Sequence, residues 1–246
     1  MPRFFVEDID TDAGNIIITG DEFYHLKKVL RLNAGDEIII FDGKGNDFIA
    51  KLETLGSKEA EACVQKKLEA SSNEPKFKIV LAQGIAKGEK MDFIIQKAAE
   101  LGVSSIMPFT ASRTVPRFKE DAVLKKIERW QKIAIEAAKQ CGRSIVPKIE
   151  SIKDFKEILI GWEGYLKIIL WEDAVCMKLK NKIQELKNLN MRGIIVIVGP
   201  EGGFSPEEVQ EAEKMGFIPS RLFENILRTE TASIVMLSII NYEIAD

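Results

Sequence analysis

The chain has 246 residues, 46% of them hydrophobic and 30% charged, with a formal net charge of −3 at pH 7. This composition excludes a disordered chain, and no apolar run approaches the roughly 18 residues of a membrane helix. One histidine, His25, and three isolated cysteines exclude a Cys/His zinc site and any mechanism built on two histidines. We expect a cytoplasmic protein, because acidic residues stand where a secretory signal would be apolar. Because these zinc ligands are missing, we also expect no bound metal.

Residues 1–70 are predicted to form a small β-barrel with one inserted helix. Five short runs have strand character and are separated by turn signals: "RFFV", "NIIITG", "EIIIFDG", "DFIAKLETLG" and "EACVQKKLE". Residues 20–35 instead carry apolar side chains at helical spacing. The stretch "EASSNEP", residues 69–75, is typical of a linker and ends this first domain.

Residues 75–246 are predicted to form an α/β domain with a mainly parallel sheet. Strand-like and helix-like segments alternate, which is typical of a parallel sheet with helices on both faces. The expected strands are "KFKIVLAQG", "SIMPFT", "LKIILWED" and "GIIVIVG", and the expected helices span about 90–102, 119–141, 176–188, 206–215 and 230–243. Ligands of such domains usually bind at the carboxyl ends of the strands.

Charge is unevenly distributed along the chain. Residues 76–148 carry 15 basic and 7 acidic side chains, whereas residues 1–72 carry 9 basic and 14 acidic ones. A phosphate backbone responds to such a local excess rather than to net charge. The basic segment therefore indicates either a nucleic-acid surface or a face that pairs with an acidic one, within a dimer or between domains.

The stretch "IIVIVGPEGGFSPEEV", residues 194–209, joins a strand to a glycine turn and a helix start. Ser205 and Glu208 form a capping-box pattern and Pro206 suits the first helical position. The lysine of a P-loop and the spacing of a dinucleotide fingerprint are both missing, and Glu201 would repel a phosphate. The turn is therefore either a structural turn or a site for a neutral or cationic ligand, such as a sulfonium ion.

A second distinctive stretch, "LFENILRTETASIVML", spans residues 222–237. It places Arg228 beside an apolar step and immediately before the last predicted helix. A cation gains nothing from the helix dipole at that end, which favours a functional role over that of an ordinary surface arginine.

These two stretches together closely resemble the paired C-terminal motifs of the SPOUT methyltransferases, and specifically the family that methylates uridine N3 in 16S ribosomal RNA. Further similar segments run through the chain in order: "RFFV", "HLKKVLRLNAGD", "LAQGIAKGEKMDFIIQKAAELGV" and "RWQKIAIEAAKQCGRSIVP". The resemblance implies a PUA-like β-barrel for RNA at residues 1–70 and a SPOUT α/β domain with a deep trefoil knot at residues 75–246. It also implies a homodimer, S-adenosylmethionine as cofactor, and 16S ribosomal RNA or the small ribosomal subunit as partner.

The resemblance also assigns site residues. The implied cofactor contacts are Trp171, Gly199, Pro200, Glu201, Gly202, Gly203, Leu222, Ile226, Leu227, Arg228 and Ala232. The implied RNA contacts are Arg3, His25, Arg31, Arg113, Arg117, Arg129, Gln140 and Arg143, whereas Trp130 and Lys132 are expected to serve packing or solvation.

Arg228 and Glu201 are the residues predicted to be catalytic, with Glu230 as an alternative proton acceptor. Loss of the N3 proton leaves negative charge on a uridine, which Arg228 is expected to stabilise. The proton acceptor is left open between Glu201, Glu230 and water.

One departure from the family pattern concerns Phe223, which stands where a glycine is common and adds bulk beside the expected adenine pocket. Three other functions stay open at this point: a non-catalytic RNA-binding or ribosome-assembly protein, a SPOUT methyltransferase with another RNA target, and a nucleotide-dependent enzyme. The last is disfavoured by Glu201 and the missing P-loop lysine.

Overall fold

The computed structural model describes residues 1–9, 14–69, 74–75, 77–114, 120–174, 182 and 191–244. Contacts divide the chain into two compact units. The first comprises Met1–Glu74 and Ala138–Val146, and the second comprises Pro75–Ala137 and Pro147–Asp246. Apart from Lys182, the predicted helix at 176–188 lies outside the described residues.

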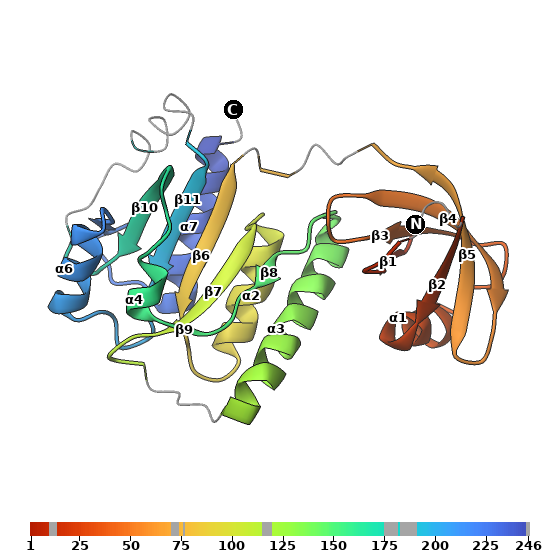
Figure 1. Cartoon of the computed structure of the whole chain (residues 1–246), viewed down its shortest axis with the longest axis horizontal. Helices are drawn as coiled ribbons and strands as arrows, with labels where there is room; N and C mark the ends of the chain where they lie inside the picture. The colour runs from red at the N-terminus through yellow and green to blue at the C-terminus, as the bar shows by residue number, and fades with distance from the viewer. Residues whose placement is uncertain are drawn as a thin grey trace. The chain divides into compact units, whose positions relative to one another are not determined.

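The first unit is built on a curled five-stranded sheet (Figure 1). Its elements are β1 (Arg3–Phe5), β2 (Asn15–Thr19), α1 (Gly20–Tyr24), a π-helical turn (His25–Val29), β3 (Glu37–Phe41), β4 (Asp47–Leu55) and β5 (Glu59–Lys67). The strand order is β1-β3-β4-β5-β2, with β1 parallel to β3 and the other pairs antiparallel. Alternating side chains face one core, as the 0–3% exposure of Ile16, Ile18, Ile38 and Ile40 shows.

The helix of the first unit is shorter than the predicted span of 20–35. It ends at Val29, where the Leu30 amide donates to the His25 carbonyl at 2.9 Å. Arg31 then takes a left-handed conformation with φ 55°, which a continuing helix does not allow. The helical pattern rested on Phe23, Leu26, Val29 and Leu30, of which Phe23 and Leu26 are buried whereas Val29 and Leu30 are 59% and 40% exposed.

The second unit is built on a parallel sheet with the strand order β12-β10-β11-β6-β7-β8, and β9 also pairs with β7. Its strands are β6 (Lys78–Gly84), β7 (Ser105–Thr110), β8 (Lys148–Ile149), β9 (Lys153–Asp154), β10 (Tyr165–Leu170), β11 (Gly193–Val198) and β12 (Ile218–Ser220). Its described helices are α2 (Lys90–Glu100), α3 (Glu120–Cys141), α4 (Phe155–Ile158), α6 (Pro206–Lys214) and α7 (Thr229–Ile244). The predicted mainly parallel α/β architecture is confirmed.

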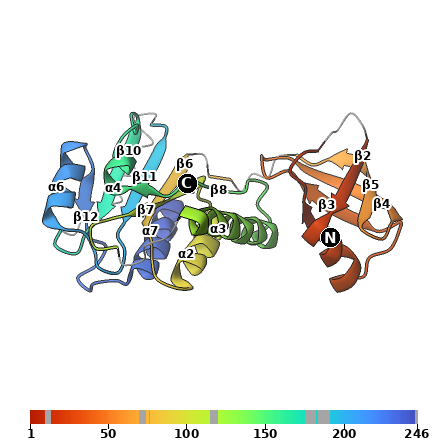
Figure 2. The ribbon, with the colours of Figure 1, turned by 60° about the horizontal axis from the view of Figure 1, so that its bottom comes forward.

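Helices cover both faces of this sheet. One core contains Ile195 and Ile197 of β11 with the buried residues of α4 and α6. Figures 1 and 2 show α2 and α7 side by side against the other face. Every residue of β11 is buried, as expected for a central parallel strand that is packed on both sides.

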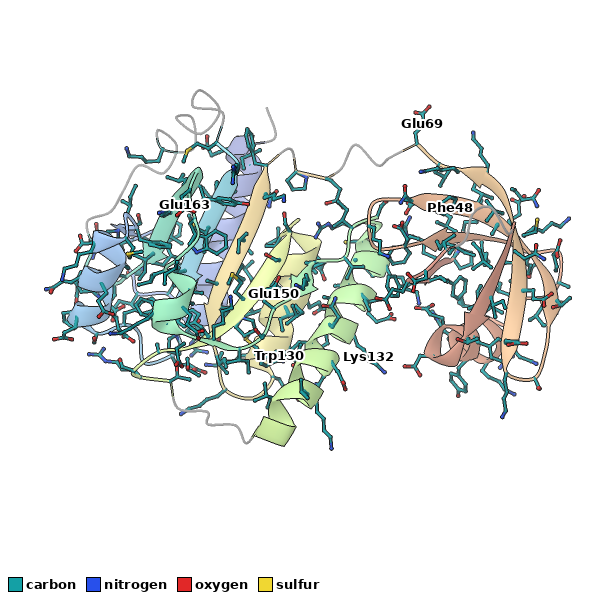
Figure 3. All side chains as sticks on the ribbon, in the orientation of Figure 1. Phe48, Glu69, Trp130, Lys132, Glu150 and Glu163 are labelled. Carbon is teal, nitrogen blue, oxygen red and sulfur yellow. The ribbon has the colours of Figure 1, made fainter. Side chains whose placement is uncertain are left out.

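The long helix α3 carries the two residues that were expected to serve packing or solvation, Trp130 and Lys132. Trp130 is 2% exposed and donates from Nε1 to Asp92 Oδ1 of α2 at 3.2 Å, whereas Lys132 is exposed (Figure 3). Within the described parts of the chain, no helix is long and apolar enough to cross a membrane. Those parts also contain no group of three or more His, Cys, Asp or Glu that could hold a metal ion.

Candidate active site

A cavity of about 400 Å³ lies at the carboxyl ends of three neighbouring strands, β10, β11 and β12. The parallel sheet brings these ends to one edge, where α/β folds usually bind ligands. All eleven predicted cofactor residues line the cavity: Trp171, Gly199, Pro200, Glu201, Gly202, Gly203, Leu222, Ile226, Leu227, Arg228 and Ala232. The fold thus brings together two motifs, residues 199–203 and 222–232, that are separate in the chain.

The glycine turn after β11 forms one wall of the cavity and needs its last two glycines. Gly203 has φ 65°, which favours glycine, and its amide donates to the Pro200 carbonyl at 3.0 Å. A methyl group at Gly202 would lie 2.8 Å from Arg113 Cβ. Side chains at these positions would therefore strain or displace the wall.

The turn is anchored at its end by Phe204 and the start of α6. Phe204 is 2% exposed and stacks on Phe109 with ring centroids 6.2 Å apart. The predicted capping box is present, because Glu208 N donates to Ser205 Oγ and Ser205 N donates to a Glu208 carboxyl oxygen. The helix start is satisfied without an anion.

Glu201 projects a fixed negative charge at the cavity. Its Oε1 accepts from the Lys87 amide at 2.9 Å and lies 3.3 Å from Lys90 Nζ. Partial burial raises the pKa of Glu201, but the hydrogen bonds from the Lys87 amide, its own amide and Lys90 outweigh burial and lower the pKa overall. The carboxylate therefore stays ionised and favours a cationic ligand.

The opposite wall is the segment Leu222–Arg228, which is largely open to solvent. Ile226 is 79% exposed and Phe223 is 48% exposed. Arg228 is exposed, and among the described residues its guanidinium has no hydrogen-bond or ion-pair partner. The segment Leu222–Arg228 thus forms an exposed apolar and cationic lip of a cavity that is also lined by Glu201.

Sequence reasoning did not find several further residues that line the cavity: Lys90, Leu170, Glu172, Val198, Phe204, Ser220, Arg221, Asn225 and Thr229. Phe223, which was expected beside the adenine pocket, also lines the cavity. Lys90 comes from α2, more than 100 residues away from the glycine turn in the chain. Lys90 could not be recognised from spacing. Glu172 directly follows the predicted Trp171 and could have been found from that neighbour.

Three of the predicted RNA contacts are engaged inside the first unit. Arg3 forms an ion pair with Asp47 at 2.8 Å and donates to the Arg143 carbonyl. Arg143 is 6% exposed and pairs with Glu74 at 2.7 Å. His25 Nδ1 lies 3.2 Å from Lys139 Nζ. These interactions stabilise the first unit, and RNA contact by these three residues stays a prediction.

The other predicted RNA contacts lie in different settings. Arg31, Arg113 and Gln140 are exposed. Arg113 also donates from Nη1 to the Gly202 carbonyl at 3.2 Å, which places it on the outer side of the glycine turn. Arg129 pairs with Asp92. Arg117 lies outside the described residues.

Comparison with known protein families finds matches over most of the chain. Residues 72–241 match the family model of the RNA methyltransferase domain, and residues 18–63 match that of the RNA methyltransferase PUA domain. The ribosomal RNA small subunit methyltransferase E of Bacillus subtilis is 32% identical, covering 99% of this chain and 97% of that protein. The protein of that name from Buchnera aphidicola is 36% identical, covering 97% and 92%.

Solved structures agree with these matches. The ribosomal RNA small subunit methyltransferase E of Neisseria gonorrhoeae, bound to S-adenosyl methionine, has a TM-score of 0.88, 32% identity and coverage of 98% and 97%. A methyltransferase of Legionella pneumophila, also in complex with that cofactor, has a TM-score of 0.89, 31% identity and coverage of 98% and 96%. The chain therefore belongs to the ribosomal RNA small subunit methyltransferase E family and combines its PUA and RNA methyltransferase domains.

Proposed function

We propose that this protein transfers a methyl group from S-adenosylmethionine to N3 of a uridine in 16S ribosomal RNA. The observation that carries the proposal is the convergence of the glycine turn and the Leu222–Arg228 segment on one cavity. The Bacillus subtilis and Buchnera relatives are named as methyltransferases of small-subunit ribosomal RNA, which supports the RNA class.

The cavity fits this cofactor in size and chemistry. A volume of about 400 Å³ is within the range of small-molecule sites. Trp171 and Leu222 offer apolar surface for a planar base, and Gly199, Gly202 and Gly203 line the cavity without side chains. The ionised Glu201 suits a positively charged ligand and repels a phosphate.

The residues around the cavity suggest distinct roles in the reaction. When bound, S-adenosylmethionine supplies a methyl group on a positively charged sulfur. Arg228, exposed at the lip, can place its guanidinium beside the uridine oxygens that gain negative charge as N3 loses its proton.

Glu201 is better suited to electrostatics than to proton transfer. The hydrogen bonds that lower its pKa also make it a weak base, and its Oε1 is already used by the Lys87 amide. Glu230 belongs to the first turn of α7, and its Oε2 lies 3.8 Å from Lys90 Nζ. We infer that water at the open lip accepts the proton.

RNA binding is proposed for the exposed part of the predicted set. Arg113 lies on the outer side of the glycine turn and keeps an exposed side chain, so it can contact a phosphate beside the cavity. Arg31 is exposed on the first unit. Few contacts are expected on that unit, because residues 1–72 carry more acidic than basic side chains.

A homodimer is proposed from the character of α7. This helix is apolar on most sides, yet Tyr242 is 79% exposed, and Phe93 of the adjoining α2 is 46% exposed. A helix that is apolar all round is normally buried, so a second copy of the chain is the proposed cover. The trefoil knot implied by the family resemblance stays a prediction.

The test combines binding and product analysis. Calorimetry with S-adenosylhomocysteine should show binding at about micromolar affinity. Small-subunit RNA incubated with protein and cofactor should yield 3-methyluridine on nucleoside mass spectrometry. Arg228→Ala should reduce methyl transfer by roughly 100-fold and cofactor affinity far less, whereas Arg192→Ala, at the opposite end of β11, should change neither.

The outcomes separate the competing functions. A wild-type protein that binds small-subunit RNA but not S-adenosylhomocysteine would be a non-catalytic RNA-binding or ribosome-assembly protein. Detection of a different methylated nucleoside would support S-adenosylmethionine as the cofactor but would contradict uridine N3 of 16S ribosomal RNA as the target.

A further inference from the structure

Three buried polar side chains form a hydrogen-bonded network beneath the cavity. Gln83 of β6 is 0% exposed, Ser233 of α7 is 1% exposed and Thr229 at the start of α7 is 7% exposed. Gln83 Nε2 donates to Thr229 Oγ1 at 2.9 Å, and Ser233 Oγ donates to Gln83 Oε1 at 2.6 Å. Buried polar groups are costly unless they are paired, and these are paired with one another.

The number of available hydrogens fixes the arrangement. Thr229 Oγ1 has one hydrogen, which it donates to the Gly199 carbonyl at 2.6 Å, so it must accept from Gln83. The second Nε2 hydrogen of Gln83 goes to the Gly84 carbonyl at 2.9 Å. A reversed amide would place Oε1 against the Gly84 carbonyl oxygen and would remove the donor to Thr229 Oγ1, which favours this orientation. The Ser233 hydroxyl also lies 3.0 Å from the Thr229 carbonyl oxygen, a second acceptor for its hydrogen.

The network joins the two walls of the cavity at their base. Gly199 begins the glycine turn, and Thr229 follows Arg228 at the end of the opposite wall. The end of β6 packs directly on the turn, because a methyl group at Gly84 would lie 2.5 Å from the Pro200 nitrogen. Gln83 is therefore bonded to one wall through Thr229 and adjoins the other through Gly84.

We propose that Gln83 and Ser233 are positioning residues that hold the two walls of the cavity at the separation required by the cofactor. Within the described chain, neither is among the residues that line the cavity, so their effect passes through Thr229 and Gly199. The inference rests on the proposed function for the identity of the ligand. Without the network, a smaller fraction of the molecules would have both walls in the position that binds the cofactor. The apparent affinity falls in proportion to that fraction.

The first experiment measures S-adenosylhomocysteine affinity in Gln83→Met and Ser233→Ala. We expect the Kd to rise by about tenfold in each, as the loss of one buried hydrogen bond predicts. Thr229→Val should also raise the Kd, and Thr229→Ser should raise it less, because it retains the hydroxyl. The control is Asn241→Ala, which removes bonds from Nδ2 to the Leu101 and Leu237 carbonyls at the other end of α7.

A second readout does not depend on the ligand. Amide hydrogen exchange of residues 199–204 and 222–228 should accelerate in Gln83→Met without cofactor and stay unchanged in Asn241→Ala. If Gln83→Met lost as much thermal stability as the control but kept both wild-type affinity and exchange, the positioning role would be overturned. A wild-type protein that bound no S-adenosylhomocysteine would instead overturn the proposed function. The amide hydrogen exchange rates of the variants would still test the positioning role, because they are measured without cofactor.

Discussion

Lys90 Nζ lies 3.3 Å from Glu201 Oε1 and 3.8 Å from Glu230 Oε2, so one ammonium group bridges two carboxylates beside the cavity. The three residues come from α2, the glycine turn and α7, which are far apart in the sequence. Lys90 lies among the cavity-lining residues together with Glu201. Because Lys90 belongs to α2, the packing of this helix determines where the ammonium group lies relative to the two carboxylates.

The first prediction concerns the pKa of Glu201. Because this pKa is lowered, the interactions of its carboxylate are present above the ordinary glutamate pKa and are lost only as pH falls through the lowered value. A carbon NMR titration should therefore place its midpoint below that of an ordinary glutamate. Lys90→Met should raise that midpoint, because Lys90 contributes both a hydrogen bond and a charge.

Lys97→Met is the matched control, because Lys97 lies on the same helix and pairs with Glu100 at 2.8 Å instead. It should leave the Glu201 midpoint unchanged. Equal midpoints in the wild type and Lys90→Met would show that the backbone amides of Lys87 and Glu201 keep the carboxylate ionised without Lys90.

The second prediction concerns Arg113. Arg113→Ala should weaken binding to small-subunit RNA and reduce the slope of log affinity against log salt by about 1, as expected for one lost phosphate contact. Filter binding at several salt concentrations measures both. Arg192→Ala removes an exposed arginine at the opposite end of β11 and should change neither; similar losses in both variants would indicate general charge attraction.

The third prediction concerns Arg143. Removing one partner of a largely buried ion pair is costly, so Arg143→Ala should lower stability by on the order of 3 kcal/mol, measured by urea unfolding. The double variant Arg143→Met with Glu74→Gln should recover part of that loss, since it leaves no buried charge unpaired. Unchanged stability combined with weaker RNA binding would instead favour the RNA contact implied by the family resemblance.

The fourth prediction concerns the proposed dimer. Tyr242→Glu places a charge on the exposed face of α7 and should shift the protein toward the monomer in light scattering during size-exclusion chromatography. Tyr24→Glu changes an exposed tyrosine of the first unit and serves as the control. If the wild type is itself a monomer at working concentration, the dimer proposal fails.

Local patterns predicted much of the fold and the cavity walls. The capping box at Ser205 and Glu208 formed as expected because both residues lie within one helical turn. The buried runs of β6 and β11 were evident because a central parallel strand is apolar on both faces. The short strands β8 and β9 were missed, since two residues carry no periodicity.

Contacts between distant segments could not be predicted from the same patterns. Lys90 reaches Glu201 across more than 100 residues, and Arg143 reaches Glu74 across 69. Arg143 could be named from its family motif, but its burial depends on a partner that no local pattern identifies. The network of Gln83, Thr229 and Ser233 was invisible for the same reason.

The assignment of Ala138–Val146 to the first unit has a practical consequence for dissecting this protein. A fragment that stops at Glu74 would lack Arg143, and both the Glu74 carboxylate and the Arg3 guanidinium would lose a partner. It would also lack the bridge between Lys44 and Ile145. RNA binding measured with such a fragment would therefore reflect the loss of these contacts as well as the loss of the second unit. The contribution of the first unit to RNA binding should be measured with point variants in the intact chain.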